Sequence, residues 1–155
     1  MERVRCCLAV LLAYLVQRCL LVQVEVLGVV PLLLPPLLCL LGMAQGPDRG
    51  AVCGLFGGLL CLLAGCSPWI LALYPLVGGV SGAVFHNSRG FWGKWLRTVP
   101  VLAGMEVLLV VGHWMAGNRF PAALAVAWPE LLLALACYPL AAGIGRIGKP
   151  RRQKL

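Results

Sequence analysis

Apolar residues fill most of the chain in long runs, and short polar or basic stretches separate these runs. The runs cover six ranges, at about 6–22, 30–44, 49–64, 69–85, 99–115 and 129–147. A helix that crosses a bilayer needs about 20 predominantly apolar residues, with a range of about 17–25. The pattern therefore predicts an all-α bundle of six transmembrane helices, several of them short, in a single membrane domain that covers residues 1–155.

Prolines modify this outline in two of the runs. Pro31, Pro35 and Pro36 in the second run predict a kink or a late helix start, because proline lacks a backbone N–H. Pro129 suits the first turn of the sixth helix. The apolar stretch 120–127 before it is too short for a further span, so we expect it either to lie at the membrane interface or to extend the sixth helix.

The composition excludes an ordinary soluble domain. Hydrophobic residues make up 61% of the chain and charged residues only 12%, and the mean hydropathy is +0.94. A soluble domain carries about 25% charged residues, so this chain has too little charge to cover a surface that faces water. We therefore expect an integral membrane protein without a soluble catalytic domain.

The basic residues predict the orientation. With the N-terminus in the cytoplasm, all 13 lysines and arginines except Arg18 and Arg119 fall on the cytoplasmic side. Some of them lie in the predicted loop HNSRGFWGKWLR, where tryptophans alternate with them as in an interfacial anchor, and others in the basic tail 148–155. Both termini are thus expected to be cytoplasmic and the cations to contact anionic lipid. Because the charge is divided among short segments, we expect no nucleic-acid partner.

Glycines are concentrated in the third run, RGAVCGLFGGLLCLLAGC. Gly50, Gly54 and Gly58 are spaced four residues apart, on one face of a helix, and Gly78 and Gly82 form a matching strip in the fourth run. Helices in lipid associate through close packing, which small residues allow. We expect these glycines to join the third and fourth helices, and the alternative is that they receive a helix from another protein.

Four polar residues lie inside or at the end of apolar runs, and Glu106 is the most informative of them. A carboxylate within a span is costly in lipid, so we expect it to face the bundle interior, either as a proton or substrate site or as an interhelical hydrogen-bonding group. Gln17 and Arg18 in the first run are its candidate partners, and His113 lies two helical turns further along the same helix. Glu130 suits a helix N-terminus.

Catalytic and metal-binding patterns are weak. Gly79-Val80-Ser81-Gly82 matches a string used by intramembrane serine proteases, with His113 as the base, but such a short match arises easily in a chain with 19 glycines. The eight cysteines form no CxxC pair and lie mostly in apolar runs. We expect no catalytic residues, no metal and no cofactor.

The order of these features resembles the MreD family of bacterial rod-shape-determining proteins. That family has a glutamine late in its first span, then a Pro-Asp-Leu-like start to the second, a Gly-Phe-x-x-Gly-Leu-Leu-x-Asp segment in the third and a Gly-Tyr-like run in the fourth. The matching residues here are Gln17, Pro31 and Leu32, then Gly54, Gly58, Leu59 and Leu60, and then the stretch YPLVGGVSG from Tyr74 to Gly82. Both acids of the family pattern are missing here. Pro31 and Leu32 match the second motif without its acid, and Leu62 stands where the third motif has its aspartate.

The resemblance implies a non-enzymatic scaffold of the peptidoglycan elongation machinery in the bacterial cytoplasmic membrane. Its implied partners are the single-span protein MreC and, through it, the wall transpeptidase, the RodA polymerase and the MreB filament. The family is also similar in fold to the substrate-binding subunits of energy-coupling-factor vitamin transporters. A vitamin-binding subunit is therefore the alternative function, and Glu106, His113 and Trp114 are candidate residues of its pocket.

Overall fold

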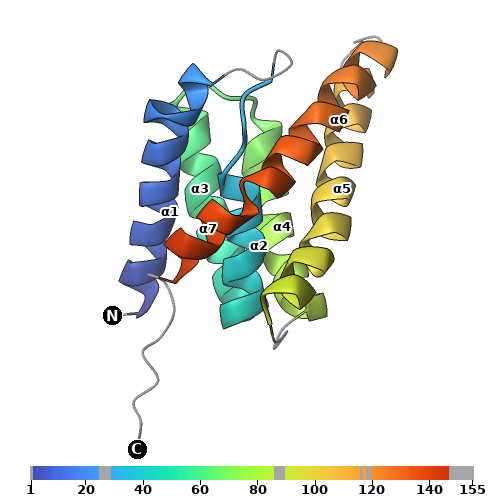
Figure 1. The fold of residues 1–155 in the computed structure, drawn as a ribbon. Helices are drawn as coiled ribbons and strands as arrows, with labels where there is room; N and C mark the ends of the chain where they lie inside the picture. Colours follow the sequence, from blue (N-terminus) through green and yellow to red (C-terminus); the bar gives the residue numbers. More distant parts are fainter. Residues whose placement is uncertain (1, 25–28, 86–89, 116, 118–119, 147–155) are drawn as a thin grey trace, which may run out of the picture.

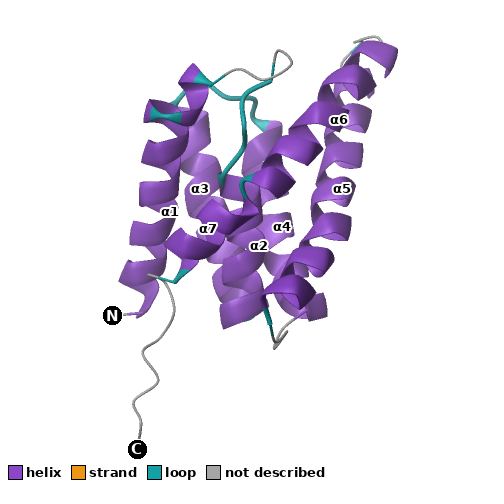
Figure 2. Cartoon of the chain, in the orientation of Figure 1, coloured by secondary structure: helices purple, strands orange, loops and turns teal. Residues whose placement is uncertain are grey.

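The computed structural model of the chain describes residues 2–24, 29–85, 90–115, 117 and 120–146, and within these ranges it is helical without a β-strand (Figure 2). The predicted basic tail 148–155, Arg89 and Arg119 lie outside the described residues. The elements are α1 (Glu2–Cys19), the short 3-10 helix η1 (Leu21–Gln23), α2 (Leu34–Gln45), α3 (Pro47–Leu63), α4 (Trp69–Phe85), α5 (Phe91–Met115), α6 (Phe120–Ala136) and α7 (Tyr138–Gly145).

Helix α2 is the centre of the bundle. It contacts α1, α3, α4, α5 and α7, and more weakly α6, and Figure 1 shows α7 crossing in front of it and the α3–α4 pair behind it. Every residue of α2 from Leu34 to Met43 is buried. The segment LPPLLCLLGM is apolar all round, as expected for a helix that is covered on every side.

Consecutive helices run in alternating directions. In Figure 1, α1, α3 and α5 run upward, whereas α2, α4 and the α6–α7 pair run downward. The pass that contains α2 is only partly helical, because a non-helical stretch, residues 29–33, leads from the upper end of the bundle to the first turn of α2. The late helix start expected from the prolines of this run is therefore present.

The first turn of α2 begins inside the bundle, where water cannot satisfy its backbone N–H groups. Gln17 of α1 meets this requirement, since its Oε1 accepts hydrogen bonds from the backbone N–H of Leu33 at 3.0 Å and of Leu34 at 3.1 Å. Pro35 and Pro36 follow and have no N–H to satisfy. The next N–H, that of Leu37, donates to the carbonyl of Leu33 at 3.4 Å. One glutamine and two prolines thus satisfy the whole buried helix start.

Helix α5 is longer than the fifth apolar run. The part of the expected loop HNSRGFWGKWLR from Phe91 onward is helical, because α5 already begins at Phe91, eight residues before the expected start at residue 99. The polar first turns carry Lys94 and Arg97, which a search for apolar runs excludes. Pro100 lies within the helix and does not end it.

The expected sixth helix, residues 129–147, is wrong at its start and in its continuity. Helix α6 begins at Phe120, so Pro129 lies in its interior and not in a first turn, and the stretch 120–127 is part of this helix. The helix breaks at Cys137, and α7 continues at an angle of 47° to α6. Pro139 accounts for the break, because its ring would clash with the carbonyl four residues earlier and it has no N–H to donate.

The outside of the bundle is strongly apolar. Leu63, Trp92 and Met115 are 75–79% exposed, and large apolar side chains are exposed on every α-helix except the central α2. Two helical stretches, Val4–Gln23 and Phe91–Met115, are long and apolar enough to cross a membrane, and the bent pair Leu124–Ala136 and Tyr138–Gly145 is a third if it counts as one span. This surface is compatible with a membrane protein, because an apolar exterior of this extent is unusual for a soluble monomer.

We predict that Gln17→Leu destabilises the protein, whereas Gln23→Leu does not. The first change leaves two buried backbone donors without an acceptor, at a cost of roughly 1–3 kcal/mol for each donor. The second is the same substitution at an exposed residue of η1. Thermal unfolding and the monodisperse fraction after size exclusion in mild detergent measure the difference. Equal melting temperatures for the two variants would show that the α2 start does not depend on Gln17.

Candidate functional site

The glycine strips lie between α3 and α4, where the two backbones touch. A Cβ atom on Gly50 would overlap the carbonyl oxygen of Gly78, and one on Gly78 would overlap that of Gly50. Further along α3, a Cβ on Gly54 would overlap the carbonyl oxygen of Tyr74. Gly58 is less tight, since its Cβ would lie 3.1 Å from the Cα of Leu71. Glycine is therefore required at the Gly50–Gly78 and Gly54 levels of this contact, and a small residue is favoured at Gly58.

Helix α2 joins the same contact through a glycine that the spacing argument missed. A Cβ on Gly42 would overlap the carbonyl oxygen of Gly78 and the Oγ of Ser81. At the end of the strip, a Cβ on Gly82 would lie 2.6 Å from backbone atoms of Gly46 and Pro47, which form the turn between α2 and α3. Gly46 has a φ of 95°, which favours glycine. Three helices meet here on small residues.

This arrangement bears on the two uses proposed for the glycines. Gly50, Gly54 and Gly58 of α3 are covered by α4, so that face leaves no room for a helix from another protein. A partner that binds this bundle must use a different face. The question of function therefore moves to the remaining polar groups and open grooves.

Gln17 and Arg18 are not partners of Glu106, contrary to the sequence-based expectation. The Oε1 of Gln17 faces the first turn of α2, and the Nη2 of Arg18 donates to the carbonyl oxygen of Ala64 at 2.8 Å. Ala64 follows the last residue of α3, where an unpaired carbonyl and the helix dipole both favour a cation. Both residues join α1 to its neighbours, and neither reaches α5.

Glu106 lies on the side of α5 that faces α6. Only 5% of the residue is exposed, and its Oε2 is the one buried side-chain oxygen or nitrogen that lacks a hydrogen-bond partner among the described residues. The expected burial of this acid is therefore present, but the expected interhelical hydrogen bond is not made by Oε2. A buried carboxylate oxygen without a donor is costly, which makes this position unusual.

The carboxylate lines an open groove between α5 and α6, which we call the α5–α6 groove. It has a volume of about 400 Å³, and apart from Glu106 its described lining is apolar. Val107, Leu124 and Trp128 of this lining are more than half exposed. The groove is thus accessible from the side of the bundle, with a single acid at its base.

Two further polar residues lie near this groove. Glu130 does not occupy a helix N-terminus, as expected from the sequence, but the interior of α6, where it interacts electrostatically with Glu106 and with His113. His113 is exposed near the end of α5. The two helices therefore carry two acids and one histidine on their facing sides, an excess of acid over base.

Ser81 and His113 do not form a protease site. The hydroxyl of Ser81 is fully buried in the glycine contact and donates to the carbonyl oxygen of Gly78 at 3.0 Å. Ser81 is one turn before the end of α4, and His113 is six turns after the start of the antiparallel α5. At 1.5 Å per residue this places them roughly 25 Å apart along the bundle. A serine nucleophile needs its base within hydrogen-bonding distance.

Metal ligands are equally dispersed. Among the described residues, no group of three or more histidine, cysteine or acidic side chains is arranged to hold a metal ion. The α5–α6 groove is therefore the open feature of the described structure that contains a polar residue predicted from the sequence, Glu106. Comparison of the chain with protein-family models, with curated proteins and with solved structures finds no match.

We predict that Gly54→Ala destabilises the bundle, whereas Gly104→Ala does not. The new methyl group at residue 54 would overlap the carbonyl of Tyr74 and force α3 and α4 apart, at a cost of about 3 kcal/mol. Gly104 lies inside α5 with nothing within 4 Å of its Cβ position, so alanine there is neutral or favourable to the helix. Thermal unfolding in detergent compares the two. A Gly54→Ala variant as stable as the wild type would show that the α3–α4 contact can open without cost.

Proposed function

We propose that the chain is a non-enzymatic membrane scaffold of the MreD type, in the bacterial cytoplasmic membrane, and that it holds one transmembrane helix of a partner in the α5–α6 groove. The partner that we propose is an MreC-like single-span protein, which would link the chain to the wall transpeptidase, the RodA polymerase and the MreB filament. The proposal combines the motif resemblance with the geometry of the groove.

The unpartnered Oε2 of Glu106 carries the proposal. This oxygen lies at the base of a groove whose other described lining residues are apolar. In hydrocarbon, a polar group is stabilised by a donor from a neighbouring helix. A partner helix with apolar side chains and one hydrogen-bond donor or cation at the depth of Glu106 would fill the groove and satisfy the acid. The nearby Glu130 strengthens the preference for a donor.

The same groove gives less support to a vitamin-binding subunit. A small-molecule pocket combines enclosure with several convergent polar groups. The α5–α6 groove is open to the side, and of the three candidate pocket residues only Glu106 lines it, whereas His113 and Trp114 do not. Its shape and chemistry fit a helix or another long apolar ligand better than a polar vitamin.

The proposed topology has six passes with both ends in the cytoplasm. The alternating helix directions support it, because the second pass is completed by the non-helical residues 29–33 together with α2. Arg5, Arg49 and Lys94 lie in the first turns of α1, α3 and α5, and Arg146 directly follows α7, so all four are near the lower end of the bundle in Figure 1, whereas Arg18 lies near the opposite end. Such a one-sided distribution is typical of a cytoplasmic face.

Reporter fusions test this topology. Two kinds of reporter are used, one active only in the cytoplasm and one active only after export. We expect the cytoplasmic kind to be active when fused after Leu155, and the exported kind to be active at Gly117, between α5 and α6. The reason is the gathering of basic residues at the end of the bundle opposite Gly117. A C-terminal fusion that is active in the exported form would contradict an even number of passes.

Filling the groove tests the proposed function. Val107→Trp places a large side chain in the groove, whereas Val126→Trp is the same change at an exposed residue of α6 outside the groove lining. In rod-shaped cells that depend on this chain, we expect Val107→Trp to reduce co-purified MreC-like protein at least tenfold and to make the cells round. Val126→Trp should preserve both, because it leaves the groove open.

Abundance in the membrane is measured alongside for both variants. Normal abundance of Val107→Trp with full partner recovery and rod-shaped cells would contradict the proposal. A co-purified vitamin that Val107→Trp displaces, with no effect on cell shape, would instead establish the small-molecule alternative.

A further inference from the structure

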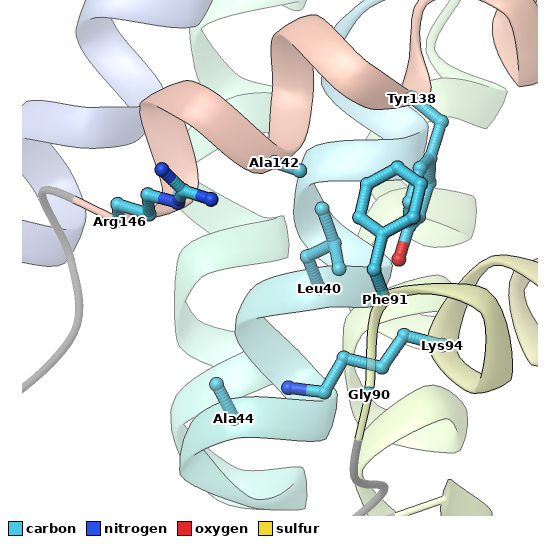
Figure 3. A pocket seen from close by; sticks show the side chains of 9 residues that line it. Leu40, Ala44, Gly90, Phe91, Lys94, Tyr138, Ala142 and Arg146 are labelled. Atoms are coloured by element: carbon cyan, nitrogen blue, oxygen red, sulfur yellow. The ribbon is translucent and has the colours of Figure 1, made fainter.

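A second cavity, independent of the α5–α6 groove, lies at the lower end of the bundle. It has a volume of about 270 Å³ and is formed where α2, the first turn of α5 and one side of α7 meet (Figure 3). We call it the basic cavity. Its lining includes Leu40, Ala44, Phe91, Lys94, Tyr138 and Arg146.

Two cations enter the basic cavity from different elements. Lys94 is on the first turn of α5, and Arg146 directly follows α7. Figure 3 shows the Lys94 side chain extending over α2 toward Ala44, and the Arg146 side chain entering from the opposite side of the cavity, near Ala142. The described residues that line the cavity include no acid. An anion in the cavity is attracted by both cations and accepts charge-assisted hydrogen bonds from them.

The remaining walls are aromatic and aliphatic. The rings of Phe91 and Tyr138 meet edge to face with centroids 5.2 Å apart, and Leu40 lies beside them. Tyr138 is 1% exposed and belongs to the core, whereas Phe91 is 45% exposed, so the tyrosine anchors the inner part of this wall. A ligand for this cavity therefore combines an anionic group for the two cations with an apolar or glycerol-like part for the aromatic wall.

We propose that the basic cavity binds a phosphate-bearing anion, and that anionic phospholipid is its natural source. Basic pockets between helices on the cytoplasmic side of membrane proteins suit anionic headgroups. Trp92 and Trp95 pack edge to face beside Phe91, and tryptophans of this kind mark the depth of lipid headgroups. Inorganic phosphate shares the same chemistry and is the other possible source.

Direct binding to the full chain in mild detergent tests the site. The probes are dihexanoyl phosphatidylglycerol, the zwitterionic dihexanoyl phosphatidylcholine and inorganic phosphate, and native mass spectrometry counts the bound molecules. We expect Lys94→Gln and Arg146→Gln each to weaken binding of phosphatidylglycerol about tenfold, as loss of one charge-assisted hydrogen bond implies. Arg97→Gln is the matched control, because Arg97 is on the same helix but lies over the ring of Phe85 and does not line the cavity.

Lys94→Arg keeps the charge and should bind phosphatidylglycerol within about twofold of the wild type. Phosphatidylglycerol bound more tightly than phosphatidylcholine, without competition by phosphate, supports a lipid site. Competition by millimolar phosphate supports the same site for free phosphate. Equal binding of the two lipids without phosphate binding, or equal losses in Lys94→Gln and Arg97→Gln, would overturn the proposal.

Discussion

The bundle depends on a helix that starts in its interior. Helix α2 begins where water is absent, so the free N–H groups of its first turn need partners from the chain itself. Gln17 supplies one oxygen for two of them, and Pro35 and Pro36 remove two more. Because all six other α-helices contact α2, this small set of residues sets the depth and direction of the central element.

The glycine contact and the groove are linked by that geometry. Gly42 of α2, Gly50 of α3 and Gly78 of α4 allow three backbones to approach one another on one side of the core. The small-residue faces of α2, α3 and α4 are thus covered by one another. The groove between α5 and α6, which contains Glu106, stays open to the side. An internal acid and an open apolar groove thus occur on the helix pair that is packed least tightly into the centre.

Local patterns determine which of these features the sequence predicts. The ends of α4 coincide with the fourth apolar run, and the four-residue spacing of the glycines marks the face of α3 that packs against α4. Hydropathy misses the start of α5 because its first turns are polar, and it misplaces Pro129 because an apolar helix tolerates an internal proline. The partners of Gln17 are backbone groups 16 and 17 residues away, which no residue type reveals. Likewise, burial of Glu106 follows from its charge, but the open side of the groove depends on how α6 is placed.

The interior start of α2 has a consequence for assembly. Its 12 residues make a helix only about 18 Å long, which is too short to span a bilayer unaided. The N–H groups of Leu33 and Leu34 also have no acceptor until α1 has brought Gln17 beside them. We therefore expect this segment to enter a membrane together with α1, and not as an independently inserted helix. The order in which the helices leave the ribosome, α1 first, presents the acceptor before the donors that require it.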